Sequence, residues 1–365
     1  MNDSQPLFLE LLKIGLWGTP ADLALFRKSP IDWKTIFDYS KYHAVASLIY
    51  DGVMSLPADL RPEKATLRQL GILIIMVEER NKYHNHQIVE ITRLLKDVDL
   101  DPILLKGQGL AKYYLNSEHR QYGDIDLFVE EQYIDRAVKA LADSGHRPFI
   151  EKSSKDICFT INGILLEVHF NSIILSYPRN MRIWNDFQNK YLLASNFHID
   201  IDGSKVRVPS PDFNALYIFL HSLKHLLTSE VSMKQLSDLS MVLYKTADQY
   251  DKTLILDTIR EMKMNKAFYT FIDILVNYLG FPSDLFPIPD KYRGKSDRVF
   301  HSILNIIPKA KTPKGYLSKR VNVSYKAVVR NLRFASLYPS ETFFYPFWII
   351  GRLPHHLGVY LKKKF

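Results

Sequence analysis

The segment spanning residues 123–129 reads Gly-Asp-Ile-Asp-Leu-Phe-Val and constrains the fold of this chain more than any other. Polar and apolar side chains alternate at its start and then give way to an apolar run, which is typical of a half-buried β-strand. Side chains two apart on a strand point to the same face, so Asp124 and Asp126 are predicted to project together. Two carboxylates so close favour a cation between them, and Mg²⁺ takes oxygen ligands of this kind. The alternative is an exposed acidic strand end.

A short strand followed by a glycine turn lies upstream of this pair. Residues 102–105 read as a buried strand that runs into Lys106, Gly107 and Gln108, and residues 110–115 have helical character. A helix that begins at a glycine turn presents backbone N–H groups to an anion, and glycine lets the backbone approach a phosphate closely. We therefore predict that these three residues bind the phosphates of a nucleotide. The alternative is a tight turn with a solvated lysine, and the spacing is not that of a Walker A loop.

Arg120 lies four residues before Asp124. From this position its guanidinium is expected to reach either the carboxylates or a bound phosphate. The alternative is a loop arginine with a surface partner.

Two hairpins are predicted in the centre of the chain. Asn-Gly and Asp-Gly are the dipeptides that two-residue hairpin turns favour, because both positions tolerate positive φ. The first hairpin joins residues 157–161 to 164–170 through Asn162-Gly163, and the second joins residues 197–201 to 205–208 through Asp202-Gly203.

Glu167 and His169 share one face of the strand at residues 164–170, opposite an apolar face. A glutamate on a central strand costs free energy unless it is paired or binds a metal. Its predicted role is therefore the third metal ligand or the general base for an attacking hydroxyl. For His169, a hydrogen-bonded structural role is favoured over a catalytic one.

This combination resembles the DNA polymerase β-like nucleotidyltransferase superfamily, and more closely a family of uncharacterised bacterial nucleotidyltransferases. That family shows Leu-Lys-Gly, an arginine, Asp-Ile-Asp-Leu-Leu-Val and, later, Glu-Leu-His-Trp. The matching residues here are Leu105-Lys106-Gly107, Arg120, residues 124–129 and Glu167-Val168-His169-Phe170, followed by His221-Ser222-Leu223-Lys224-His225 and Leu236-Ser237-Asp238.

The resemblance implies that Asp124 and Asp126 hold Mg²⁺, or Mn²⁺, and that Glu167 replaces a third aspartate. It implies transfer of a nucleoside monophosphate from a nucleoside triphosphate, ATP among them, to a hydroxyl acceptor with release of pyrophosphate. Lys106-Gly107 departs from the Gly-Ser of most superfamily members, which leaves the triphosphate contacts open. The alternative is a non-catalytic binding or regulatory protein that uses this fold through its basic C-terminal surface.

The helical segment after residue 211 carries His221 and His225 on one face. Two histidines spaced in this way can bind zinc, but the sequence offers no evident third ligand beside them. Lys224 is predicted to face the nucleotide or the acceptor, with simple packing as the alternative.

The chain of 365 residues is predicted to be an α+β protein: a small mixed-sheet nucleotidyltransferase core at residues 98–210, between helical regions at residues 1–97 and 211–365. Residues 63–95 are expected to form one long helix or two in series, and Asp212 is expected to cap the first helix of the third region.

Charge is unevenly distributed along the chain, whose formal net charge is +9. Residues 291–365 contain 16 Lys or Arg and only two acids, Asp297 and Glu341. Such a segment predicts an anionic partner: nucleic acid, an anionic membrane surface or an acidic acceptor. Its final stretch mixes aromatic residues with Lys362, Lys363 and Lys364, which favours a helix packed through its aromatic face and ended by solvated lysines. The alternative is a helix lying on a membrane surface.

Cys158 is the only cysteine, so an intrachain disulfide is excluded. The first residues lack the pattern of a signal peptide, and the sequence has no run of about 20 apolar residues that would span a membrane. A cytoplasmic location is therefore expected. The sequence leaves the acceptor, the base preference and the oligomeric state open.

Overall fold

The computed structural model describes residues 4–121, 123–150, 153, 155–305 and 316–362. Its strands form one mixed sheet in the order β3-β4-β5-β2-β1-β7-β6. The strands are β1 (Ile103–Leu104), β2 (Asp124–Phe128), β3 (Pro148–Ile150), β4 (Asp156–Ile161), β5 (Ile164–His169), β6 (Phe197–Ile201) and β7 (Ser204–Val208). Strand β2 pairs in parallel with β5 and antiparallel with β1. The predicted α+β class with a mixed sheet is confirmed.

Both predicted hairpins are present, as β4–β5 and β6–β7. Their turn residues have positive φ throughout: 50° and 80° at Asn162 and Gly163, and 50° and 79° at Asp202 and Gly203. Two consecutive residues of this kind match the twist of the flanking strands.

Helices surround the sheet. Those toward the N-terminus are α1 (Ser4–Trp17), α2 (Leu23–Phe26), α3 (Trp33–Tyr42), α4 (Ala46–Ser55), α5 (Lys64–Lys96), α6 (Gln108–Ala111) and α7 (Ile134–Asp143). Those toward the C-terminus are α8 (Pro178–Gln188), α9 (Pro211–Thr228), α10 (Met233–Lys245), α11 (Lys252–Glu261), α12 (Asn265–Leu279), α13 (Asp297–Leu304), α14 (Tyr316–Arg333) and α15 (Pro339–Lys362).

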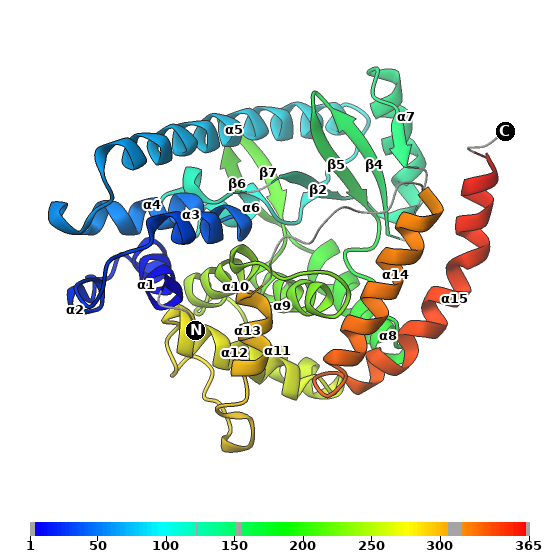
Figure 1. The fold of residues 1–365 in the computed structure, drawn as a ribbon. Coiled ribbons are helices and arrows are strands. Elements are labelled where there is room, and N and C mark those ends of the chain that lie inside the picture. Colours follow the sequence, from blue (N-terminus) through cyan, green and yellow to red (C-terminus); the bar gives the residue numbers. More distant parts are fainter. Residues whose placement is uncertain (1–3, 122, 151–152, 154, 306–315, 363–365) are drawn as a thin grey trace.

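One face of the sheet is covered by α5 and α7 (Figure 1). Ile88 and Ile91 of α5 share a hydrophobic cluster with Ile125 of β2 and Leu166 of β5. The segment that could have been one helix or two is thus the single helix α5, which is 33 residues long. Its amphipathic C-terminal half covers the strands that carry the carboxylates.

The other face of the sheet looks toward α9 and α10 (Figure 1). The Asp212 cap prediction is wrong, because Ser210 caps α9: its hydroxyl accepts a hydrogen bond from the backbone N–H of Phe213 at 3.2 Å. Pro211 occupies the first turn, where its missing N–H costs nothing. The carboxylate of Asp212 instead accepts a hydrogen bond from the backbone N–H of Asp251.

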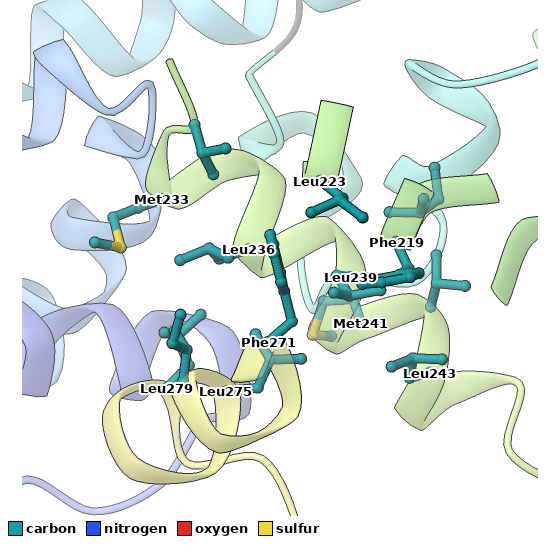
Figure 2. Packing of buried hydrophobic residues seen from close by; sticks show 14 of the residues in the cluster. Phe219, Leu223, Met233, Leu236, Leu239, Met241, Leu243, Phe271, Leu275 and Leu279 are labelled. Atoms are coloured by element: carbon teal, nitrogen blue, oxygen red, sulfur yellow. The ribbon is translucent and has the colours of Figure 1, made fainter. Parts of the chain in front are cut away.

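The helical core joins both ends of the chain. Figure 2 shows Phe219 of α9, Leu236 of α10 and Phe271 of α12 packed together. Leu11 and Leu12 of α1 belong to the same buried cluster. The predicted division of the chain into three regions, at residues 97 and 210, stays a prediction. The buried cluster contains residues from all three of these regions. None of the described helices combines the length and the apolar content needed to cross a bilayer.

Candidate active site

Asp124 and Asp126 on β2 face a cavity of about 150 Å³ between the sheet and helices α9 and α10. Asp126 is buried and Asp124 is half-buried. Their predicted common face is confirmed, because both line this cavity. The remaining lining residues are Lys106, Gly107, Arg120, Ile218, His221, Ser222, His225, Lys234, Gln235 and Asp238.

The buried carboxylate of Asp126 has two cationic or donor partners. The ammonium of Lys106 lies 3.0 Å from its Oδ1, and Nε2 of His169 donates to the same oxygen at 2.9 Å. Burial alone would raise the pKa of Asp126, but Lys106 and His169 outweigh burial and hold this pKa far below its ordinary value. The pKa of Lys106 is raised, because attraction to Asp126 exceeds the effect of burial. Lys106 therefore already neutralises the carboxylate of Asp126, for which the sequence analysis expected a metal ion.

Glu167 reaches the same place from the neighbouring strand, because β5 runs parallel to β2 with Glu167 opposite Asp126. Its Oε2 lies 3.2 Å from Nε2 of His169 and 3.4 Å from Nζ of Lys155. The hydrogen bond from His169 is the main reason that the pKa of Glu167 is lowered. The expected hydrogen-bonded role of His169 is confirmed.

A metal could be held by this group, since ligand atoms of Asp126, Glu167 and His169 lie within 4.8 Å of one another. Asp124 faces the cavity but is not part of that group. Two carboxylates and an imidazole suit a divalent cation.

Glu167 also lies within 4.8 Å of ligand atoms of Asp156 and Cys158 on β4. Burial raises the pKa of the Cys158 thiol to about 12. The thiol is therefore protonated at neutral pH and a poor ligand. This second group is a weaker metal site than the first.

Gly107 lies directly before α6 as its N-cap, has a φ of 61° and lines the cavity. The helix predicted at residues 110–115 is wrong in extent, since α6 starts at Gln108 and makes only one turn. The chain then turns so that the hydroxyl of Tyr114 reaches Asp238 at 2.6 Å, a tertiary contact that overrides local helix preference. Gln108 is buried, and its Oε1 has no hydrogen-bond partner in the described part of the chain.

Arg120 faces the cavity but binds Asp238 of α10 rather than either carboxylate of β2. Its Nε and Nη2 donate to Oδ1 and Oδ2 of Asp238 at 2.7 and 2.8 Å. Both side chains are buried. The alternative of a loop arginine with a surface partner is therefore wrong, because the partner of Arg120 is the buried Asp238, bound through two hydrogen bonds.

Lys224 is not among the residues that line the cavity. Its ammonium lies 3.1 Å from Glu341 and about 5.3 Å from the ring centres of Tyr345 and Trp348 on α15. A nucleotide-binding role for Lys224 stays a prediction, and the structure gives this residue other partners.

Sequence reasoning missed Lys234, one helical turn before Asp238 on α10. Its half-buried ammonium faces the cavity and has no ion-pair or hydrogen-bond partner among the described residues. Burial, with repulsion from Arg120, lowers its pKa. The available signal was the four-residue spacing to Asp238, which places both on one helix face.

His221 and His225 also line the cavity, with ring centres 4.5 Å apart. Burial and the nearby Lys106 lower the pKa of His225 to about 4. His225 is thus neutral at pH 7. On the helical side of the cavity, formed by α9 and α10, the positive charge is therefore that of Lys234.

A family model described as an uncharacterised nucleotidyltransferase matches residues 29–280. No curated relative matches the sequence. Among solved structures, the antibiotic-resistance factor ANT(2'')-Ia is 14% identical with a TM-score of 0.38, over 50% of this chain and 95% of that one. An antigenic nucleotidyltransferase-like protein from Paracoccidioides brasiliensis is 13% identical with a TM-score of 0.35, over 55% of this chain and 95% of that one. Both likenesses are weak beside the family match.

Proposed function

Because this chain belongs to the family of uncharacterised nucleotidyltransferases, we propose that it transfers a nucleoside monophosphate from a nucleoside triphosphate to a hydroxyl acceptor. The observation that carries the proposal is the meeting of three carboxylates on two parallel strands. Asp124 and Asp126 of β2 and Glu167 of β5 project from one face of the sheet, beside a cavity that Gly107 and Lys234 also line.

Asp124, Asp126 and Glu167 are proposed to hold a divalent cation, Mg²⁺ or Mn²⁺. The fit to a cation is supported by Asp126 and Glu167, because their ligand oxygens lie within 4.8 Å of each other and of a nitrogen of His169. When bound, such a cation stabilises negative charge on the phosphates.

Lys234, Gly107 and Lys106 are proposed to bind the triphosphate. The ammonium of Lys234 has no partner among the described residues, so a phosphate can take that place without breaking an ion pair. Gly107 has no Cβ, so a phosphate can approach its backbone closely. The ion pair with Asp238 holds the guanidinium of Arg120 in a fixed position at the edge of the cavity.

Glu167 is proposed to accept the proton of the acceptor hydroxyl. The hydroxyl oxygen forms a bond to the α-phosphorus, and the bond from that phosphorus to the bridging oxygen breaks. The electron pair leaves with pyrophosphate. The lowered pKa of Glu167 keeps its carboxylate ionised at neutral pH, which a proton acceptor requires. The basic C-terminal segment favours an anionic acceptor.

Calorimetric titration of the protein with each nucleoside triphosphate, with and without Mg²⁺, tests this function. Asp124→Asn is the most informative variant, because Asp124 is half-buried and the exchange leaves the Lys106–Asp126 ion pair intact. We expect metal-dependent binding that Asp124→Asn weakens at least tenfold, and that the exposed control Asp143→Asn retains. Equal binding by the site variant and the control would reject the assignment.

A non-catalytic binding or regulatory protein is the second candidate function. It is favoured by the ion pair that already neutralises Asp126 through Lys106. For this second function we expect nucleoside triphosphate binding to be weak or absent, with or without Mg²⁺ or Mn²⁺.

A further inference from the structure

Helices α14 and α15 lie next to each other at one edge of the molecule (Figure 1). Their inner faces are anchored. Arg330 Nε donates to the carbonyl of Leu226 at 2.8 Å, and Glu341 accepts hydrogen bonds from the backbone N–H groups of Ser176 and Tyr177 at 2.7 and 3.1 Å. This pair of helices is therefore docked on the body of the protein through its inner side.

Both helices also carry large apolar side chains on their outer sides, and we call these side chains the outer apolar faces. They are between 47% and 67% exposed: Val323, Tyr325, Val329 and Leu332 on α14, and Phe343, Phe347 and Ile350 on α15. Tyr325, Val329 and Leu332 recur at intervals of four and three residues, as do Phe343, Phe347 and Ile350. Each set therefore forms one stripe along its helix.

The two stripes lie opposite the anchored sides. On α14 the buried residues are Ala327 and Asn331, about half a turn away from Tyr325 and Leu332, and Phe334 directly after the helix is buried as well. A helix that packs on the protein body through one face has no structural need for a second apolar face. Exposed apolar patches of this kind mark interaction sites.

The charge around the outer apolar faces is positive. Within residues 322–351, the exposed charged side chains are Lys326 and Arg333, and the single acid, Glu341, is buried. The sequence adds Arg352 and the run Lys362, Lys363 and Lys364, whose side chains lie outside the described part of the structure. The partner must therefore accept apolar side chains and carry negative charge.

We propose that the outer apolar faces of α14 and α15 dock the protein on the surface of a membrane that contains anionic lipids. Phe343, Phe347 and Ile350 enter the boundary between headgroups and acyl chains, and Lys326 and Arg333 meet the headgroups. A second copy of this chain fits less well, because it would bring two basic surfaces together. A nucleic acid would leave Val329, Leu332 and Ile350 without a stacking partner.

Helix α5 offers a matched control. Its N-terminal half exposes Ile72, Ile75 and Met76 between 54% and 64%, which is comparable to the outer apolar faces. The flanking turns of α5 carry Glu78 and Glu79 as well as the cations Arg68 and Arg80, so acids and bases balance there. Apolar exposure with balanced rather than positive charge is thus present in the same molecule.

Vesicle flotation of the full chain tests the proposal, with phosphatidylcholine vesicles compared with vesicles that also contain phosphatidylglycerol. We expect flotation with the anionic vesicles only. The triple variant Phe343→Ser/Phe347→Ser/Ile350→Ser should lose binding about tenfold or more, and Lys326→Glu/Arg333→Glu should also weaken it. The control Ile72→Ser/Ile75→Ser/Met76→Ser should float like the unchanged protein. Unchanged thermal unfolding of each variant shows that folding is intact, since all the altered residues are exposed.

Three outcomes would overturn the proposal. The first is no flotation of the unchanged protein with anionic vesicles. The second is equal flotation of the α15 triple variant. The third is a dimer in analytical ultracentrifugation that the α15 triple variant abolishes, which would assign the face to a second copy of the chain. Each readout is independent of nucleotide transfer.

Discussion

Asp126 depends on its neighbours more than any other residue of the site. It is 2% exposed, and one oxygen accepts from both Lys106 and His169. A buried carboxylate loses its hydration, so the attraction of these two groups must compensate for that loss. The consequence of removing either partner can be measured in the free protein.

Lys106→Met should lower the free energy of unfolding by about 3 kcal/mol at pH 7, because it leaves Asp126 buried without its cation. Urea unfolding followed by circular dichroism measures this. The matched control is Lys139→Met, which breaks the exposed pair with Asp143 on α7 and should cost less than about 0.5 kcal/mol. Similar losses in the two variants would show that Lys106 does not stabilise the site electrostatically.

The buried pair of Arg120 and Asp238 joins the loop before β2 to α10 across the cavity. Arg120→Met alone should cost about 3–5 kcal/mol, since it leaves the buried carboxylate of Asp238 without its cation and with only the hydroxyl of Tyr114 as a donor. Adding Asp238→Leu should cost less than the sum of the two single changes, because no lone charge then remains. A double-mutant cycle in urea measures the coupling, and strict additivity would contradict it.

At the scale of residues, the sequence revealed which side chains share a strand but not which ones meet across the fold. Asp124 with Asp126, and Glu167 with His169, follow from the two-residue period of a strand. The partner of Arg120 lies 118 residues away, and no local pattern specifies it.

At the scale of elements, two glycines let α1 and α4 touch through their backbones. A Cβ at Gly15 of α1 would lie 2.1 Å from the carbonyl oxygen of Leu48, and one at Gly52 of α4 would lie 2.4 Å from that of Leu11. Backbone atoms cannot move aside as a flexible side chain can. The helix-weakening cost of glycine is thus offset by close packing.

Gly15→Ala should therefore lower the free energy of unfolding by about 1–3 kcal/mol, through overpacking of the α1–α4 contact. Gly71 of α5 is the control, because a Cβ there would meet nothing within 4 Å. Gly71→Ala should raise stability by about 0.5–1 kcal/mol, as expected inside a helix. Thermal and urea unfolding of the two variants should therefore shift in opposite directions. A stabilised Gly15→Ala variant would show that the two helices can separate without cost.

Elements specified by local chemistry were predictable from the sequence, whereas those specified by packing were not. The hairpin turns follow from turn residues, and the helical structure of residues 63–95 follows from apolar spacing, which left one helix or two in series open. By contrast, β1 is only two residues long and exists through its pairing with β2 and β7. The single turn of α6 likewise depends on contacts made elsewhere in the chain.

At the scale of the whole molecule, the N-terminal and C-terminal helical regions pack against each other. His43 follows α3, and its ring connects this N-terminal helix to two distant ones. Its Nδ1 accepts from the backbone N–H of Met233 in α10 at 3.4 Å, and its Nε2 donates to the carbonyl of Leu304 in α13 at 3.3 Å. The neutral ring satisfies both contacts at once. The sequence predicted the helices, but contacts over such separations follow only from the folded structure.

The stability of the whole fold should therefore depend on pH through His43. Burial lowers its folded-state pKa to about 4, against 6.5 as the ordinary value. Above pH 6.5 the ring is neutral in both states, so His43 adds no pH dependence there. As pH falls from 6.5 toward 4, only the unfolded state takes up the proton, and stability falls by up to about 3 kcal/mol.

Urea unfolding of the unchanged protein and of His43→Gln, between pH 4 and 8, isolates this effect. His225 has a similarly lowered pKa and adds to the slope, whereas His119 and His169 have raised pKa values and oppose it. These three contributions are common to both proteins, so the difference between the two curves reports His43 alone.

That difference in the free energy of unfolding should be constant above pH 6.5 and shrink as the pH falls, because the variant lacks the buried imidazole. The exposed control His198→Gln should follow the unchanged protein at every pH. Parallel curves for His43→Gln and the unchanged protein would mean that the folded-state pKa of His43 lies at its ordinary value, and that burial does not oppose protonation of the ring.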